Sequence, residues 1–154
     1  MNINRTLDIT LLTIKDMDVL EISADENAKQ MLTLLQDYLI NVNDIPVYLN
    51  KMATEYIVVD DIACLEEGRF VRWIFEGKMT RGGFVLKKKQ QYNAGLEDDV
   101  LDETNGIDDY VLCKTAHNRI VQFHFDECPC FQKLNMFEQW YMLHNTKKEE
   151  KAKN

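Results

Sequence analysis

The sequence RFVRWIFEGKMTRGGFVLKKKQQY, residues 69–92, carries the clearest strand signals of the 154-residue chain. Two runs rich in β-branched and aromatic residues flank the turn-prone segment 76–83, a pattern that predicts a β-hairpin with a longer loop. Side chains of a strand alternate between faces. In the first run, this alternation places Val71, Trp73 and Phe75 on one face and Phe70, Arg72 and Ile74 on the other.

All six glycines lie between residues 68 and 106, so the segments before and after this range lack glycine and are free to be helical. Ser23 and Glu26 fit a capping box, and apolar residues at three- and four-residue spacing follow it, so we predict a helix over 24–40. Pro46 can open a second, short helix over 46–52. Residues 1–22 alternate only in part and predict a two-stranded ribbon or an irregular arm.

The remaining segments complete a mixed fold. Residues 54–65 predict a strand that is broken at Asp60-Asp61, and a second hairpin pairs 110–115 with 119–125. Asn135 with Glu138 predicts the start of a C-terminal helix over 135–146. The fold class is therefore α+β, with a meander of about five antiparallel strands (roughly 54–126) flanked by the two helices. We expect one domain over 1–146 and a charged flexible tail over 147–154.

Composition narrows the class of protein. An apolar fraction of 45% and a charged fraction of 29% are ordinary for a globular domain. The N-terminus resembles no signal peptide, and no run of 18 apolar residues occurs, so we expect no membrane segment. Four cysteines without an export signal predict a reducing intracellular compartment, either cytoplasm or nucleus, or a virion or infected-cell component.

The hairpin is unusually basic. Seven cations and one acid, Glu76, lie between residues 69 and 89. Cations beside exposed aromatic side chains on a sheet are how many nucleic-acid readers combine phosphate contacts with base stacking. Lysines also protect sheet edges from aggregation. A further interpretation is that the acidic segment 93–109, with seven carboxylates and no lysine or arginine, neutralises the hairpin.

The C-terminal helix is rich in aromatic residues and methionine. Most of this apolar area should pack on the sheet, and any exposed remainder would suit a protein partner. The candidate partner-binding residues are Phe70, Arg72, Arg81, Lys87, Lys88, Lys89, Trp140 and Tyr141.

A zinc site is a second possibility, carried by Cys113, His124, Cys128 and Cys130. The spacing lacks the short cysteine knuckles of most zinc fingers, and alternation turns His124 away from the core, so we expect buried thiols and no metal.

Catalytic motifs are missing from the sequence. No phosphate loop, dinucleotide fingerprint or serine-nucleophile motif occurs, and the only serine, Ser23, is assigned to a helix cap. We therefore expect no catalytic residues and no cofactor. The expected function is a non-catalytic interaction or structural module, a small accessory subunit of a larger assembly with protein partners; a viral assembly would fit the composition. The alternatives are a nucleic-acid-binding regulator that uses hairpin 69–92 and a small zinc-binding domain.

Overall fold

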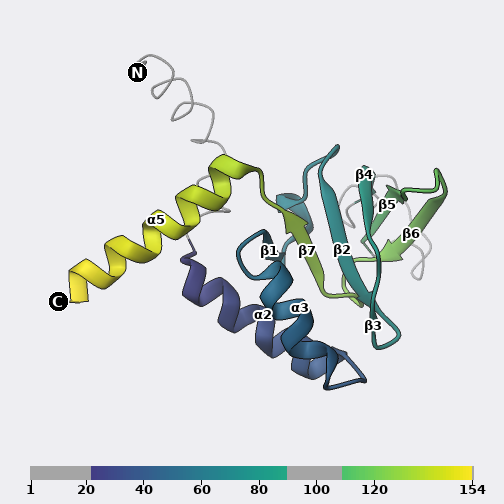
Figure 1. The fold of residues 1–154 in the computed structure, drawn as a ribbon. Coiled ribbons are helices and arrows are strands. Elements are labelled where there is room, and N and C mark those ends of the chain that lie inside the picture. Colours follow the sequence, from purple (N-terminus) through teal and green to yellow (C-terminus); the bar gives the residue numbers. More distant parts are fainter. Residues whose placement is uncertain (1–21, 90–108, 154) are drawn as a thin grey trace, which may run out of the picture.

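The structure, a computed structural model, describes residues 22–89 and 109–153. Within these ranges it contains a curved antiparallel sheet together with three α-helices (Figure 1). The strands are β1 (Tyr56–Val59), β2 (Phe70–Phe75), β3 (Lys78–Met79), β4 (Gly83–Lys89), β5 (Tyr110–Lys114), β6 (Ile120–His124) and β7 (Cys130–Lys133). The helices are α2 (Ala24–Tyr38), α3 (Asp44–Met52), the 3-10 turn η1 (Ile62–Cys64) and α5 (Met136–Lys153). The predicted α+β class is confirmed.

Strand β7 changes the predicted meander. The sheet order is β1-β7-β2-β4-β5-β6, with β3 paired to β2, so β7 lies between two strands that are consecutive in sequence. Phe131 of β7 pairs with Val58 on one side and with Arg72 on the other. The last part of the chain therefore joins the first strand to the rest of the sheet.

The central hairpin forms, but its turn is tighter than predicted. Glu76 and Gly77 have positive φ angles of 51° and 81°, which suits a two-residue turn that follows the twist of the strands. The return strand begins at once as β3, and after a break it continues as β4. Phe75 pairs with Lys78 at the hairpin tip and is exposed, unlike Val71 and Trp73, with which it shares the predicted face.

Local signals located the helices well. Ser23 caps α2, and its hydroxyl oxygen accepts the Glu26 N–H at 3.1 Å. The second half of the predicted strand 54–65 is instead η1, because the Asp61 side chain accepts the Ala63 N–H and caps that turn. Helix α5 continues to Lys153, beyond the predicted end at 146. Of the ribbon predicted within 1–22, residues 1–21 lie outside the described residues, as do residues 93–108 of the acidic segment.

Two cores lie on opposite faces of the sheet. The first core contains fifteen buried residues, among them Val71, Trp73 and Phe123. The rings of Trp73 and Phe123 stack with their centroids 4.3 Å apart. The second core lies under α2 and α3 and contains Met31, Leu35, Leu39, Met52, Tyr56, Ile74 and Phe131. Because helices cover this second face over β1, β7 and β2, Ile74 is buried although it points away from Trp73.

Asn27 of α2 is fully buried and bonds to the outer edge of β1. Its Oδ1 accepts the Val58 N–H at 3.0 Å, and its Nδ2 donates to the Tyr56 and Ala53 carbonyls at 2.8 and 3.2 Å. A single side chain therefore satisfies two backbone groups at this edge of the sheet and one at the end of α3.

Candidate partner-binding surfaces

Three of the seven hairpin cations, Arg69, Arg72 and Lys88, make contacts within the protein that stabilise the fold. Both terminal nitrogens of Arg69 donate to the buried carboxylate of Glu138, and the Nη2–Oε2 distance is 2.7 Å. Glu138 and Asn135 also exchange hydrogen bonds between side chain and backbone, the capping box at the start of α5. Arg69 therefore fixes α5 to the sheet.

Lys88 caps the turn η1. Its Nζ donates to the carbonyl oxygens of Ile62, Ala63 and Leu65 at 3.1, 3.0 and 2.5 Å. These carbonyls lie at the C-terminal end of a helical turn, where a cation is favoured. Lys88 is thus held by the protein itself rather than presented to a partner.

Phe70 and Arg72 lie on the face that the sequence indicated, but α3 packs against that face. Phe70 is half-buried beside the second core and meets Phe84 edge to face at 5.1 Å. The Arg72 guanidinium lies 5.4 Å from the centre of the Tyr48 ring, and its Nε donates to the Thr80 carbonyl at 2.9 Å. Neither residue is the fully exposed side chain that the sequence suggested.

The second half of the hairpin contributes to an open surface. On the side opposite the first core, Phe84 of β4, Lys114 of β5 and Ile120 of β6 form one row. A bulge in β4 places Leu86 and Lys87 together beside Leu112 in the next row. We call this surface the β4–β6 face; its members are Phe84, Leu86, Lys87, Lys89, Leu112, Lys114, Ile120 and Gln122.

The β4–β6 face is apolar and cationic. Phe84, Leu86 and Ile120 are 50%, 43% and 63% exposed, and the three lysines among them are exposed too. The three strands contain no acidic residue. Gly83 allows β4 to lie close to β5, because a Cβ there would stand 2.8 Å from the Lys114 carbonyl oxygen. Arg81 is also exposed, just before β4.

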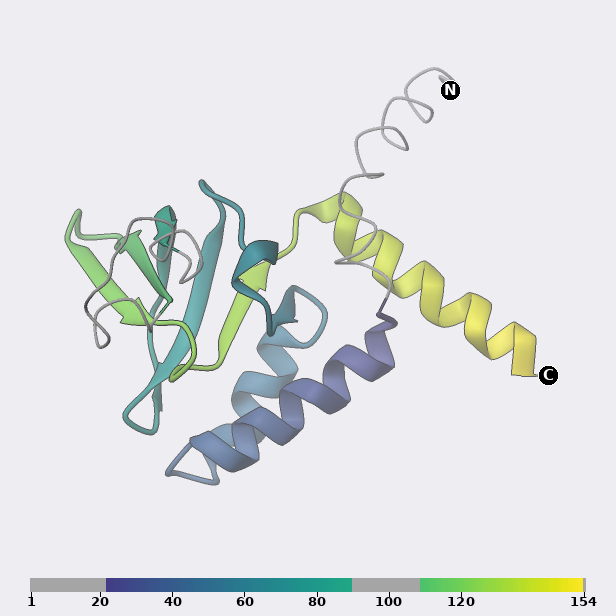
Figure 2. The same ribbon diagram turned by 180° about the vertical axis from the view of Figure 1, so that it is seen from behind.

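A second exposed surface follows one side of α5. Met136, Trp140 and Leu143 recur at helical spacing and are 85%, 55% and 43% exposed. The Trp140 ring stacks on His144 at 4.9 Å. Tyr141, in contrast, is half-buried against the first core. Figures 1 and 2 show the C-terminal half of α5 extending away from the sheet.

The cysteines and His124 do not assemble a metal site. Cys113 is fully buried, whereas His124 alternates with the buried Phe123 and Phe125 and so lies on the opposite face of the sheet. Within the ranges 22–89 and 109–153, no three metal-ligating side chains come together. Burial raises the pKa of the Cys113 thiol to about 12, so this thiol stays protonated and a poor ligand at neutral pH.

Alkaline pH is expected to destabilise the protein through these thiols. Burial also raises the pKa of Cys130, and the neighbouring Cys113 and Cys128 raise it further. The pKa of Cys128 is raised by burial and then by the negative charge of Glu127. Unfolded thiols release protons near pH 9 while the folded ones keep them. Stability is therefore fully present below pH 9 and falls above it, by about 1.4 kcal/mol per pH unit for Cys113 until its folded pKa of about 12 is reached.

Urea unfolding at pH 8 and pH 10 checks this expectation. Cys113→Ala should unfold at lower urea at both values because it leaves a small cavity, but its loss between pH 8 and 10 should be smaller than that of the unaltered protein. Equal pH dependence in the two proteins would contradict a titrating Cys113.

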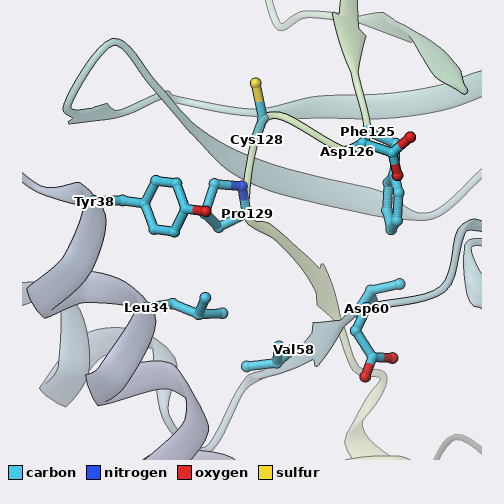
Figure 3. A pocket seen from close by; sticks show the side chains of 9 residues that line it. Leu34, Tyr38, Val58, Asp60, Phe125, Asp126, Cys128 and Pro129 are labelled. Atoms are coloured by element: carbon cyan, nitrogen blue, oxygen red, sulfur yellow. The ribbon is translucent and has the colours of Figure 1, made fainter. Parts of the chain in front are cut away.

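A shallow pocket of about 200 Å³ lies between α2, the end of β1 and the β6–β7 connection (Figure 3). Leu34, Val58 and Phe125 form its apolar part, and the carboxylates of Asp60 and Asp126 lie at its rim. Cys128 lines the pocket, but Figure 3 shows its sulfur pointing away from Asp60. The raised pKa of this thiol makes it a weak nucleophile, so the pocket offers no pair of activated groups.

Comparisons with protein-family models, curated proteins and solved structures give no match for this chain. Of the helices that the structure describes, none is long and apolar enough to cross a membrane.

Sequence reasoning missed most of the β4–β6 face. Phe84, Leu86, Lys114 and Ile120 were not among the candidate residues. The alternation of Phe84 and Leu86 about Val85 could have indicated an exposed apolar row, and Lys114 and Ile120 flank the second predicted turn. What the sequence did not supply is which side of the sheet the helices cover.

Proposed function

We propose that this protein is a non-catalytic interaction module, a small accessory subunit that binds an acidic surface of a protein partner through the β4–β6 face. The observation that carries the proposal is the combination of three exposed large apolar side chains with three exposed lysines and no acid in the same strands. Apolar area supplies affinity and the lysines select partners of opposite charge.

The stripe on α5 supports the same function. Trp140 is the residue type most enriched among energetic anchors of interfaces, and Met136 beside it is almost fully exposed. Tyr141 contributes by holding the helix against the first core, so the stripe is presented on a fixed support.

A single-stranded nucleic acid is the second candidate ligand of the β4–β6 face. Exposed Phe84 among lysines favours it, since a base can stack on the ring while lysines meet phosphates. The packing of Phe70 and Arg72 against the helices makes nucleic-acid binding less favourable. Among the described residues of this face, Phe84 is then the one largely exposed aromatic ring on which a base could stack.

Site-specific photo-crosslinking tests the proposal. We expect p-benzoylphenylalanine placed at Leu86 to give one discrete covalent adduct in an extract of the source organism. The adduct should disappear on protease treatment and should weaken when salt rises from about 0.05 to 0.5 M, because screening shortens the range of the lysine charges. The same group placed at Lys29, exposed on α2, is the matched control.

The outcomes distinguish protein binding, nucleic-acid binding and the absence of a specific partner. A protein adduct from position 86 and none from position 29 supports the proposed function. An adduct that nucleases remove would replace it with nucleic-acid binding, and equal labelling from both positions would mean that the β4–β6 face has no specific partner.

A further inference from the structure

We infer that the open edge of β6 binds an extended acidic segment of the partner as an additional strand of the sheet. This inference rests on the proposed function and names the form of the partner: an extended chain in which acidic and apolar residues alternate. Strand addition of this kind obtains affinity from main-chain hydrogen bonds and specificity from alternate side chains.

The two edges of the sheet differ in how they are covered. At the β1 edge, Leu134 N–H donates to the Glu55 carbonyl, so odd-numbered residues of β1 face β7 and even-numbered ones point outward. Asn27 bonds to those outward groups of Tyr56 and Val58. In the described part of the chain, β6 pairs with β5 alone. Figures 1 and 2 show β6 at the far side of the sheet from α2 and α3.

The hydrogen-bond register of β6 tells which backbone groups point toward its edge. Phe125 N–H donates to the Asp109 carbonyl at 2.9 Å, and Thr115 N–H donates to the Arg119 carbonyl at 2.8 Å. Odd-numbered residues of β6 therefore bond to β5, since bonded and non-bonded pairs alternate in an antiparallel ladder. The backbone N–H and C=O of Ile120 and Gln122 consequently point away from β5, toward an added strand.

Within β6 itself, the residue types that block pairing at an edge are missing. Its sequence, IVQFH, contains no lysine, glutamate or proline, the residues with which natural proteins block pairing. Ile120 is 63% exposed, and Val121 is only half-buried at the border of the first core. An added strand with apolar residues on the Val121 side would extend that core.

The cations near β6 favour an acidic partner strand. Arg119 is exposed at the start of β6, and Lys114 lies across from Ile120 on β5. An added strand would lie about 5 Å from β6 and about 10 Å from β5, within one Debye length at moderate salt. Acidic side chains on the outward face of that strand would therefore be attracted, and basic ones would be repelled.

The experiment titrates the full-length ¹⁵N-labelled protein with a blocked seven-residue peptide of alternating glutamate and valine. We expect saturable amide shifts centred on β6, and about tenfold weaker binding for Gln122→Pro, which removes one outward N–H that the β5–β6 ladder does not use. Gln122→Ala keeps the N–H and should bind like the unaltered protein. A peptide with lysine in place of glutamate should bind at least severalfold more weakly.

Several results would overturn the inference: shifts centred away from β6 in the unaltered protein, equal weakening by Gln122→Pro and Gln122→Ala, or equal binding of the lysine peptide. The map of shifts in the unaltered protein decides the matter even if Gln122→Pro fails to fold. If the peptide ignores β6 while position 86 still forms its protein adduct, the added strand is wrong and the proposed function stands. If both fail, both are wrong.

Discussion

Glu138→Ala is expected to lower the free energy of unfolding by about 3–5 kcal/mol, the usual cost of removing one partner of a buried ion pair. Glu138 is 3% exposed and bonds to two nitrogens of Arg69. Without the carboxylate, the largely buried Arg69 guanidinium loses its buried counter-charge and keeps only the more exposed Glu66, and the Asn135 N–H loses its acceptor. Urea unfolding followed by circular dichroism measures the loss.

Glu66→Ala is the matched control for this experiment. Glu66 also contacts Arg69, at 3.3 Å through Nε, but its side chain is 41% exposed. Exposed ion pairs contribute at most about 1 kcal/mol, so this variant should remain close to the unaltered protein in stability. Similar losses in the two variants would show that burial does not distinguish the two carboxylates.

Asn27→Ala is expected to cost about 3 kcal/mol or more, because removal of this side chain leaves buried backbone groups of Val58 and Tyr56 without a partner. The Ala53 carbonyl loses its bond as well. Alanine has the higher helix propensity, so a loss of stability here must come from the bonds to β1 and not from α2 itself.

Gln30→Ala on the exposed side of the same helix is the control and should be neutral or slightly stabilising. Amide hydrogen exchange adds a local readout, since the Val58 N–H should exchange faster in Asn27→Ala than in Gln30→Ala. Unchanged protection of Val58 would contradict the role assigned to Asn27.

Local signals in the sequence predicted the elements that are stabilised locally. The pair Ser23 and Glu26 marked the start of α2, and Asn135 with Glu138 marked that of α5. Strand β7 was missed because its four residues, CFQK, show no alternation: Cys130 and Phe131 are buried on opposite faces, between two neighbouring strands. A central strand of this length is recognisable only once both of its partners are known.

The candidate surface was harder to predict, because distant residues decide whether each hairpin cation bonds within the protein or stays exposed. Arg69 bonds to Glu138, which is 69 positions away, and Lys88 bonds to η1, which begins 26 positions earlier. The charge count was correct, but nothing local separates these internal cations from exposed Lys87 and Lys89. The same holds for Phe70, which packs against the second core.

The place of β7 has a consequence for how the chain folds as it is synthesised. In the described ranges, β1 meets the rest of the sheet only through Cys130–Lys133, and the second core under α2 and α3 contains Phe131. Until these residues emerge from the ribosome, the facing borders of β1 and β2 lack the strand that pairs with both, and the second core lacks Phe131. Completion of the described sheet therefore depends on non-local pairing with residues late in the chain, a pattern that leaves apolar surface exposed while the chain is incomplete.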